Sequence, residues 1–172
     1  MQIHQFSMQY SPEEDRILFR MNTLDKEEFS FYLTRRFVGL LWPLLLQQME
    51  KKLMEQQAVH TTAVKAMLDF EHEKIVSRAN FQQKYDEDIK NHPLGNEPVL
   101  LTQIRIRQKE KGNILCLLPS QGRGVEFSLT PAFLHTFCKL LQDAVGKADW
   151  GIHTSLPGYT GSNPGRSGET IH

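Results

Sequence analysis

The sequence carries one pattern of apolar and polar residues twice. Residues 15–47 align with residues 112–143, with one residue fewer in the loop of the second stretch. The aligned positions are Ile17 with Ile114, Leu18 with Leu115, Phe31 with Phe127, Leu33 with Leu129, Thr34 with Thr130, Phe37 with Phe133, and Leu44 and Leu45 with Leu140 and Leu141. Because an internal repeat constrains the architecture before any single element does, the sequence predicts a duplicated unit of strands followed by a helix.

The local signals in both halves agree with this unit. In the first half, alternating apolar residues predict strands at 2–10, which slips register near His4, at 16–22 and at 28–33. In the second half, the expected strands are 99–108, 113–118 and 125–129. Thr34 and Thr130 stand where helix N-caps belong, and Pro131 suits the first helical position. The first helix contains Pro43, where we expect a kink rather than an end.

A helical insertion separates the two halves. The first helix continues to about residue 57, and a second runs over about 60–77 with Ala63, Met67, Phe70 and Ile75 as its apolar stripe. Residues 79–98 lose periodicity and are interpreted as a long surface connection. After Trp150 the composition turns to Gly, Ser, Pro and Thr, which cannot offset chain entropy by packing.

These elements predict an α+β fold in one domain. Two strand-strand-strand-helix units are expected to be related by a pseudo-two-fold axis, with the helical insertion between them. The expected boundaries are a single domain at 1–152, repeat halves at about 1–50 and 98–150, an insertion at 51–97, and a disordered tail at 153–172.

Charge and composition restrict the classes of partner. Twenty basic residues balance twenty acidic ones among 172 residues, so no net field attracts a polyanion or an anionic membrane. Cys116 and Cys138 lie in apolar patterns without disulfide or zinc spacing, and are interpreted as small core residues in a reducing compartment. The longest apolar run, 37–46, is about half of a bilayer span. We therefore expect a cytoplasmic protein with no membrane partner.

The sequence shows no convincing catalytic or metal-binding set. His72 lies between Glu71 and Glu73, and neighbours one residue apart on a helix point in different directions. His60 and His135 are expected to be exposed or at a helix edge, and no histidine has a companion at ligand spacing. Cys138 follows His135 by three residues, but a core cysteine is the favoured interpretation because the first copy has Trp42 there. We therefore expect no catalytic residue, no metal and no cofactor.

Basic residues provide the one candidate binding site. Arg105 and Arg107 alternate with apolar residues, so one face of their strand is basic; with Lys109, Lys111 and Arg123 it could line a positively charged sheet face. Such a face binds single-stranded nucleic acid through the backbone and by base stacking. Arg123 also lies between two glycines in the loop 119–124, which suits an anion, although a tight turn explains the same glycines.

Several segments resemble a family of small uncharacterised bacterial proteins. They are DRILFRMNT, FYLTRRFVGLLWPLLL, HPLGNEPVLLTQI and LQDAVGKADWG. The resemblance implies a cytoplasmic bacterial protein and assigns no activity and no binding residue. The doubled strand-rich unit ending in a helix is also similar in outline to the Whirly, Pur-alpha and PC4-like single-strand binders, an analogy of fold that does not fix function.

The function favoured by the sequence is a non-catalytic interaction or regulatory module. Its partner would be another protein or a second copy of the chain in a homodimer. The alternative is a single-stranded nucleic-acid-binding protein that uses Arg105, Arg107 and Arg123. A third hypothesis, an enzyme with a small-molecule pocket between the halves, is the least favoured because no acid-base pair stands out.

Overall fold

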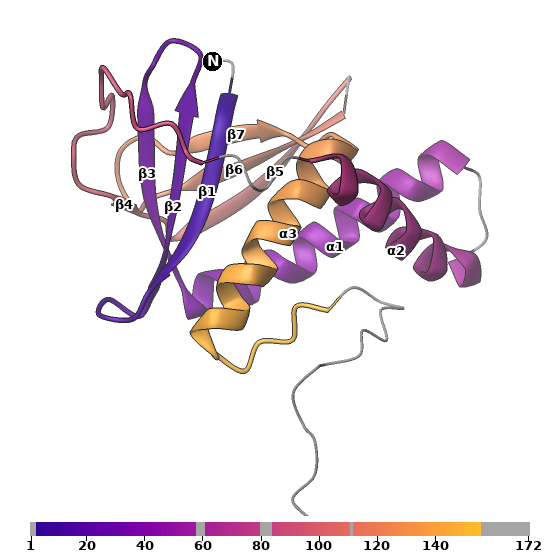
Figure 1. Cartoon of the computed structure of the whole chain (residues 1–172). Helices are drawn as coiled ribbons and strands as arrows, with labels where there is room; N and C mark the ends of the chain where they lie inside the picture. Colours follow the sequence, from indigo (N-terminus) through magenta and orange to yellow (C-terminus); the bar gives the residue numbers. More distant parts are fainter. Residues whose placement is uncertain (1–2, 58–60, 80–83, 111, 156–172) are drawn as a thin grey trace, which may run out of the picture.

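The computed structural model describes residues 3–57, 61–79, 84–110 and 112–155 (Figure 1). The first sheet contains β1 (Ile3–Ser11), β2 (Arg16–Thr23), β3 (Glu28–Thr34) and β4 (Val99–Leu100). The second sheet contains β5 (Gln103–Lys109), β6 (Gly112–Leu118) and β7 (Val125–Ser128). The helices are α1 (Arg35–Gln57), α2 (Thr61–Arg78) and α3 (Pro131–Ala148). The predicted α+β class is confirmed.

Each sheet is built around an antiparallel meander, and each meander leads into a helix. The order is β1-β2-β3 followed by α1, and β5-β6-β7 followed by α3. The predicted slip near His4 is a bulge between Ile3 and Gln5. The strand expected at 99–108 is two strands, because β4 pairs in parallel with β3 whereas β5 pairs with β6. Thr102, between them, donates its amide to the Leu118 carbonyl at 2.9 Å, so the chain passes from one sheet to the other here.

Strand pairing corrects the aligned register of the repeat. Phe19 lies opposite Phe31 in the first sheet, and Leu115 lies opposite Phe127 in the second. The same number of residues therefore separates the paired positions in both units, and Leu115 corresponds to Phe19 rather than to Leu18. The alignment left one residue out of the loop so that Ile17 matched Ile114, and this gap was wrong. A shift of one residue moves every side chain of a strand to the opposite face. The pseudo-two-fold axis stays a prediction.

The helix starts follow the predicted capping. The Thr34 hydroxyl accepts the Phe37 amide, and the Thr130 hydroxyl accepts the Phe133 amide, both at 3.2 Å. The first helix continues through Pro43, as expected, to Gln57. The bond between the Gln142 side chain and the Thr154 carbonyl holds the chain against α3 beyond its end. The rest of the expected disordered tail, 156–172, lies outside the described residues.

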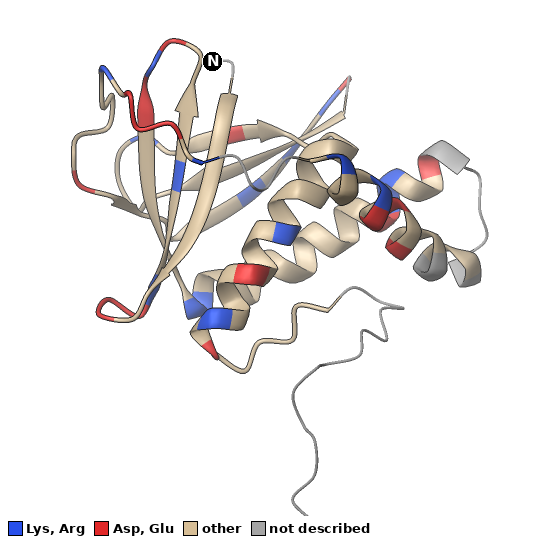
Figure 2. Ribbon diagram, viewed as in Figure 1, with Lys and Arg blue, Asp and Glu red and all other residues tan. Residues whose placement is uncertain are grey.

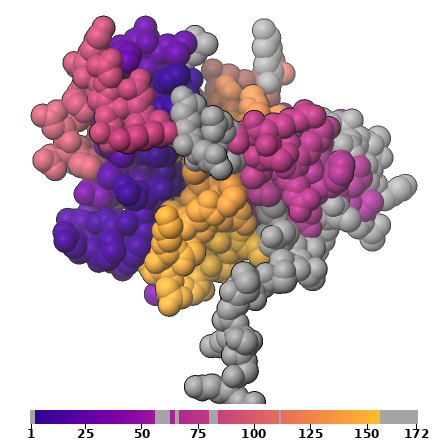
Figure 3. Space-filling view, viewed as in Figure 1, coloured from indigo at the N-terminus to yellow at the C-terminus, as the bar shows by residue number. Residues whose placement is uncertain are grey.

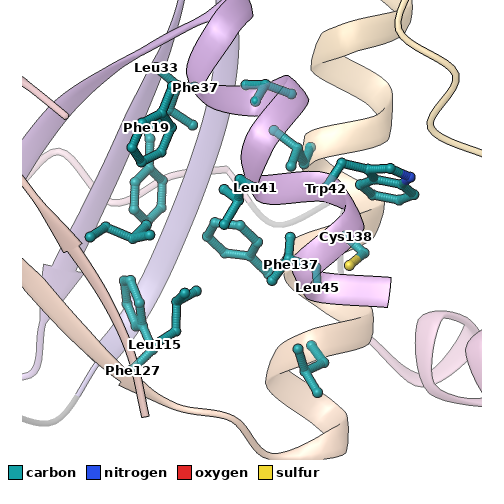
Figure 4. Packing of buried hydrophobic residues seen from close by; sticks show 14 of the residues in the cluster. Phe19, Leu33, Phe37, Leu41, Trp42, Leu45, Leu115, Phe127, Phe137 and Cys138 are labelled. Carbon is teal, nitrogen blue, oxygen red and sulfur yellow. The ribbon is translucent and has the colours of Figure 1, made fainter. Parts of the chain in front are cut away.

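The core lies between the two sheets and helices α1 and α3 (Figure 4). Its centre is aromatic: Phe19 lies 5.9 Å from Phe31, 6.0 Å from Phe127 and 5.5 Å from Phe137 between ring centroids. Trp42 and Cys138 are both buried at matching places of α1 and α3. One hydrophobic core is therefore shared by both units.

Helix α2 packs against α1 and α3 with a different face from the one expected. Val64 and Leu68 are buried, whereas Ala63 is exposed and Phe70 is 69% exposed. The predicted stripe was wrong at Ala63 and Phe70, whereas Met67 packs against the core and Ile75 is half-buried. Apolar residues lie on several sides of α2. The sequence pattern therefore does not identify which face of this helix is buried.

The connection after α2 is held against the first sheet. Residues 84–92, here called the strap, contain no helix and no regular strand, as expected of a surface connection. The Asp86 carbonyl accepts the Asn22 side-chain amide at 3.0 Å, and the Asn91 carbonyl accepts the Glu28 amide at 2.9 Å. Lys26 pairs with Asp86 at 3.2 Å and with Asp88 at 2.7 Å. The strap therefore has a defined position on β2 and β3.

Candidate functional site

A groove of about 540 Å³ lies between β1 and α3. Six consecutive residues of β1, from Ile3 to Met8, line one side, and Ala132, Phe133, Thr136 and Leu140 of α3 line the other. Tyr85 of the strap completes it. Figure 3 shows α3, in orange to yellow, beside the indigo N-terminal strands.

The groove follows the edge of a sheet. Successive side chains of a strand point to opposite faces, so a pocket on one face would be lined by alternate residues. Here every residue of a continuous stretch contributes, and β1 pairs with β2 alone among the described strands. The Gln5 amide is directed to β2, where the Asn22 side chain accepts it at 2.9 Å. Since amides alternate between the two edges of a strand, those of Phe6 and Met8 are directed to the edge of β1 that no described strand pairs with.

The lining of the groove is largely apolar, with the His4 imidazole among its polar groups. The Phe6 ring centroid lies 5.9 Å from that of Phe133 and 6.2 Å from that of Phe137, which anchors the strand to α3. Among the described lining residues none is Asp, Glu, Lys or Arg. This groove suits an uncharged, largely apolar ligand rather than a polyanion.

Tyr85 is fixed by two charged residues outside the groove. Its hydroxyl donates to Glu28 at 3.1 Å, and the Arg20 guanidinium lies over its ring, 4.7 Å from the centroid. Burial, followed by the nearby Glu28 carboxylate, raises the pKa of Tyr85 above its ordinary value. The phenol therefore stays neutral and presents its ring, not a charge, to the groove.

The predicted basic residues of β5 are exposed on one face of the strand. Figure 2 marks the Lys and Arg positions of the whole ribbon in blue. Arg105 donates to the Gln103 side chain at 3.2 Å, and Arg107 donates to Glu126 at 2.5 Å. The Glu126 carboxylate thus offsets one of the two charges. Lys111 lies outside the described residues.

Arg123 is exposed in the loop between β6 and β7. The backbone conformation of the loop requires both glycines that flank Arg123. Gly122 has φ +91°, and a Cβ on Gly124 would lie 2.0 Å from the Leu117 carbonyl oxygen. The turn interpretation accounts for both glycines, and an anion bound at Arg123 stays a prediction.

The two cysteines occupy different environments. Cys138 lies in the core with its sulfur 3.6 Å from that of Met49, and burial raises the pKa of its thiol. Its interpretation as a core cysteine is confirmed. Cys116 is also buried, but it lies outside the core cluster, on the face of β6 between Arg105 and Glu126.

A histidine pair that the sequence did not reveal joins α2 and α3. Nδ1 of His72 lies 3.1 Å from Nδ1 of His135, and His135 is only 3% exposed. The expectation that His135 is exposed or at a helix edge was therefore wrong, and His72 is a companion in space although no histidine has one at ligand spacing in the sequence. Sixty-three residues separate the partners, and no local spacing signals such a pair. His60 lies outside the described residues.

Among the described residues the pair has no third His, Cys, Asp or Glu ligand. Within residues 3–57, 61–79, 84–110 and 112–155, no group of three or more His, Cys, Asp or Glu side chains could hold a metal ion. Burial lowers the pKa of His72, and burial lowers that of His135 to about 4, so both rings are neutral at pH 7.

Comparison with known proteins gives no match, whether to a family model, a curated protein or a solved structure. In the described part of the chain, no helix has both the length and the apolar character that crossing a bilayer requires.

Proposed function

We propose that the protein is a non-catalytic interaction module that binds an extended, largely apolar segment of a partner protein along β1. The observation that carries the proposal is the groove, which joins an edge of β1 that pairs with no other described strand to a largely apolar lining without Asp, Glu, Lys or Arg. The proposal includes the cytoplasmic bacterial setting implied by the sequence resemblance. The two free cysteines suit a reducing compartment.

Strand addition explains both parts of the groove. An extended peptide gains main-chain hydrogen bonds from an open sheet edge, and pockets for alternate side chains give specificity. The edge amides of Phe6 and Met8 supply the donors. Phe133 and Leu140 of α3 then offer apolar surface to the side chains that point toward the helix.

A peptide selection tests this proposal. The tag-free chain is used to select from a displayed library of random peptides, and the affinity of synthetic winners is measured by fluorescence anisotropy. Ala132→Arg places a long side chain in the groove from the helix side and should weaken binding by about tenfold or more. Gly146→Arg is the matched control, since Gly146 is exposed on α3 with nothing within 4 Å of a Cβ there.

Two results would contradict the proposal. One is equal binding by both variants, and the other is insensitivity of the peptide to N-methylation at every second residue, which removes the donors of an added strand. Concentration-dependent dimerisation by light scattering that Ala132→Arg abolishes would identify a second copy of the chain as the partner.

Single-stranded nucleic-acid binding through Arg105, Arg107 and Arg123 is the alternative. It is supported by the exposure of all three arginines and opposed by the Arg107–Glu126 ion pair and by the absence of aromatic residues from β5. Anisotropy of labelled single-stranded oligonucleotides should then show binding that weakens steeply with salt. Absence of binding at low salt would eliminate it.

A further inference from the structure

We propose that His72 and His135 form a binding site for one divalent transition-metal ion, which both imidazoles ligate through Nδ1. The pair lies between two packed helices, α2 and α3. Neither histidine lines the proposed peptide groove. Its ligand class is the set of ions that imidazole prefers, with Zn²⁺ as the representative.

The separation of the two nitrogens matches a shared ion. Zn–N bonds are about 2.0–2.1 Å long, so two nitrogens on one ion lie about 2.9 Å apart at a right angle and about 3.4 Å apart at the tetrahedral angle. The observed 3.1 Å falls between these values. The ring planes are inclined by 48° with centroids 5.3 Å apart, so the two Nδ1 atoms face one another between the rings, and a swing of the partly exposed His72 ring would turn both toward one ion.

The rings are held in place before an ion binds. His135 is buried in α3 beside Leu134 and Cys138, which are fully buried. His72 follows the buried Leu68 by one helical turn and is partly exposed. The buried ring therefore gives the site a fixed ligand, and the partly exposed ring leaves solvent a route to the ion. Water would fill the remaining coordination positions.

The protons balance when the ion replaces the direct contact. Without an ion, one neutral ring donates Nδ1–H to Nδ1 of the other. For both Nδ1 atoms to ligate, that ring must carry its proton on Nε2 instead, so neutral rings release no net proton. Lys139 lies close enough to lower the pKa of His72 and repels any cation here. The site should therefore be weaker than one with three or four protein ligands.

Calorimetric titration of the tag-free full chain with Zn²⁺ at pH 7.5 tests the proposal. The expected result is one ion per chain and a Tm that rises with Zn²⁺, because an ion that binds only the folded state stabilises it. Mg²⁺, which prefers oxygen ligands, should do neither. No heat and no rise in Tm with Zn²⁺ would overturn the proposal.

Matched asparagine variants assign the ligands. His72→Asn keeps a hydrogen-bonding atom near the Nδ1 position while removing an imidazole ligand. Loss of a residue that only orients a ligand costs about 10- to 100-fold in metal affinity, so His72→Asn should lose at least about tenfold. His92→Asn removes a histidine that lies 3.8 Å from Glu28 and should bind Zn²⁺ as the wild type does. Unchanged affinity of His72→Asn would refute the site.

Nitrogen NMR gives a test that does not depend on the stability of any variant. In the ¹⁵N-labelled wild type, Zn²⁺ should shift the Nδ1 resonances of two histidines and leave their Nε2 atoms protonated. Shifts confined to Nε2 atoms, or to histidines other than these two, would overturn the proposal even if His135→Asn fails to fold.

Discussion

The two strand-strand-strand-helix units share a pairing register, yet their outer strands face different surroundings. The edge of β1 lies beside α3 of the other unit, in a groove with no Asp, Glu, Lys or Arg among its described lining residues. The edge strand β5 instead exposes Arg105 and Arg107. Charged residues on an edge strand discourage pairing with another chain. The two units therefore present edge strands of different character, one lined with apolar residues and one bearing exposed arginines.

The largest expected effect concerns the centre of the core, where the units differ in size. Phe19 and Leu115 hold corresponding positions, and Phe19 contacts aromatic rings of both units. Phe19→Ala should lower the free energy of unfolding by about 3–5 kcal/mol, and Leu115→Ala by less, though still about 2 kcal/mol or more. Denaturant unfolding measures both. A larger loss for Leu115→Ala would contradict the account of a core centred on Phe19.

The turns between the second and third strands of each unit provide the next test. The first unit turns through Lys26 at φ 63°, whereas the second needs Gly124, whose Cβ would strike the Leu117 carbonyl. Gly124→Ala should destabilise the protein by about 1–3 kcal/mol through this overlap. Gly39→Ala, at an exposed position of α1 with open space around it, should instead stabilise by about 1 kcal/mol. If both variants change stability equally, backbone approach at Gly124 is not the cause.

A smaller effect on stability is expected at Asp15, where Trp150, which follows α3, contacts the first unit. The Asp15 carboxylate accepts the Trp150 indole N–H at 2.6 Å and the Tyr10 hydroxyl at 3.0 Å. These hydrogen bonds hold the pKa of Asp15 below its ordinary value of 3.8. A lowered pKa contributes stability that is present above the unfolded value and is lost as pH falls through the folded one. Asp15→Asn should therefore flatten the fall in Tm below about pH 4. A fall as steep as in the wild type would mean that Asp15 contributes nothing to it.

The smallest expected effect is a difference in thiol reactivity between Cys116, on the outer face of the second sheet, and Cys138, in the core. Cys116 lies near Arg107 and Glu126, whose side chains are about half exposed, whereas Cys138 lies inside the core. In the native protein a thiol reagent should modify Cys116 before Cys138, because only Cys116 lies beside half-exposed side chains. Mass spectrometry of the modified peptides measures the order. Earlier labelling of Cys138 would be inconsistent with this packing.

Local signals in the sequence predicted what depends on neighbouring residues. The two threonine caps, the bulge near His4 and the helix through Pro43 are all set by residues within a few positions. The face of α2 and the break before β5 depend on tertiary packing, and both differed from expectation. The groove and the His72–His135 pair join segments far apart in the chain, so no local sequence pattern predicts them.

A chemical-shift map of the binding surface tests the central claim most directly. Amide spectra of the ¹⁵N-labelled chain are recorded with increasing amounts of a selected peptide. The account predicts that the largest shifts lie in β1 at residues 3–8 and on the groove side of α3, while Arg105 and Arg107 stay unchanged. Shifts centred on β5, with β1 unaffected, would contradict it.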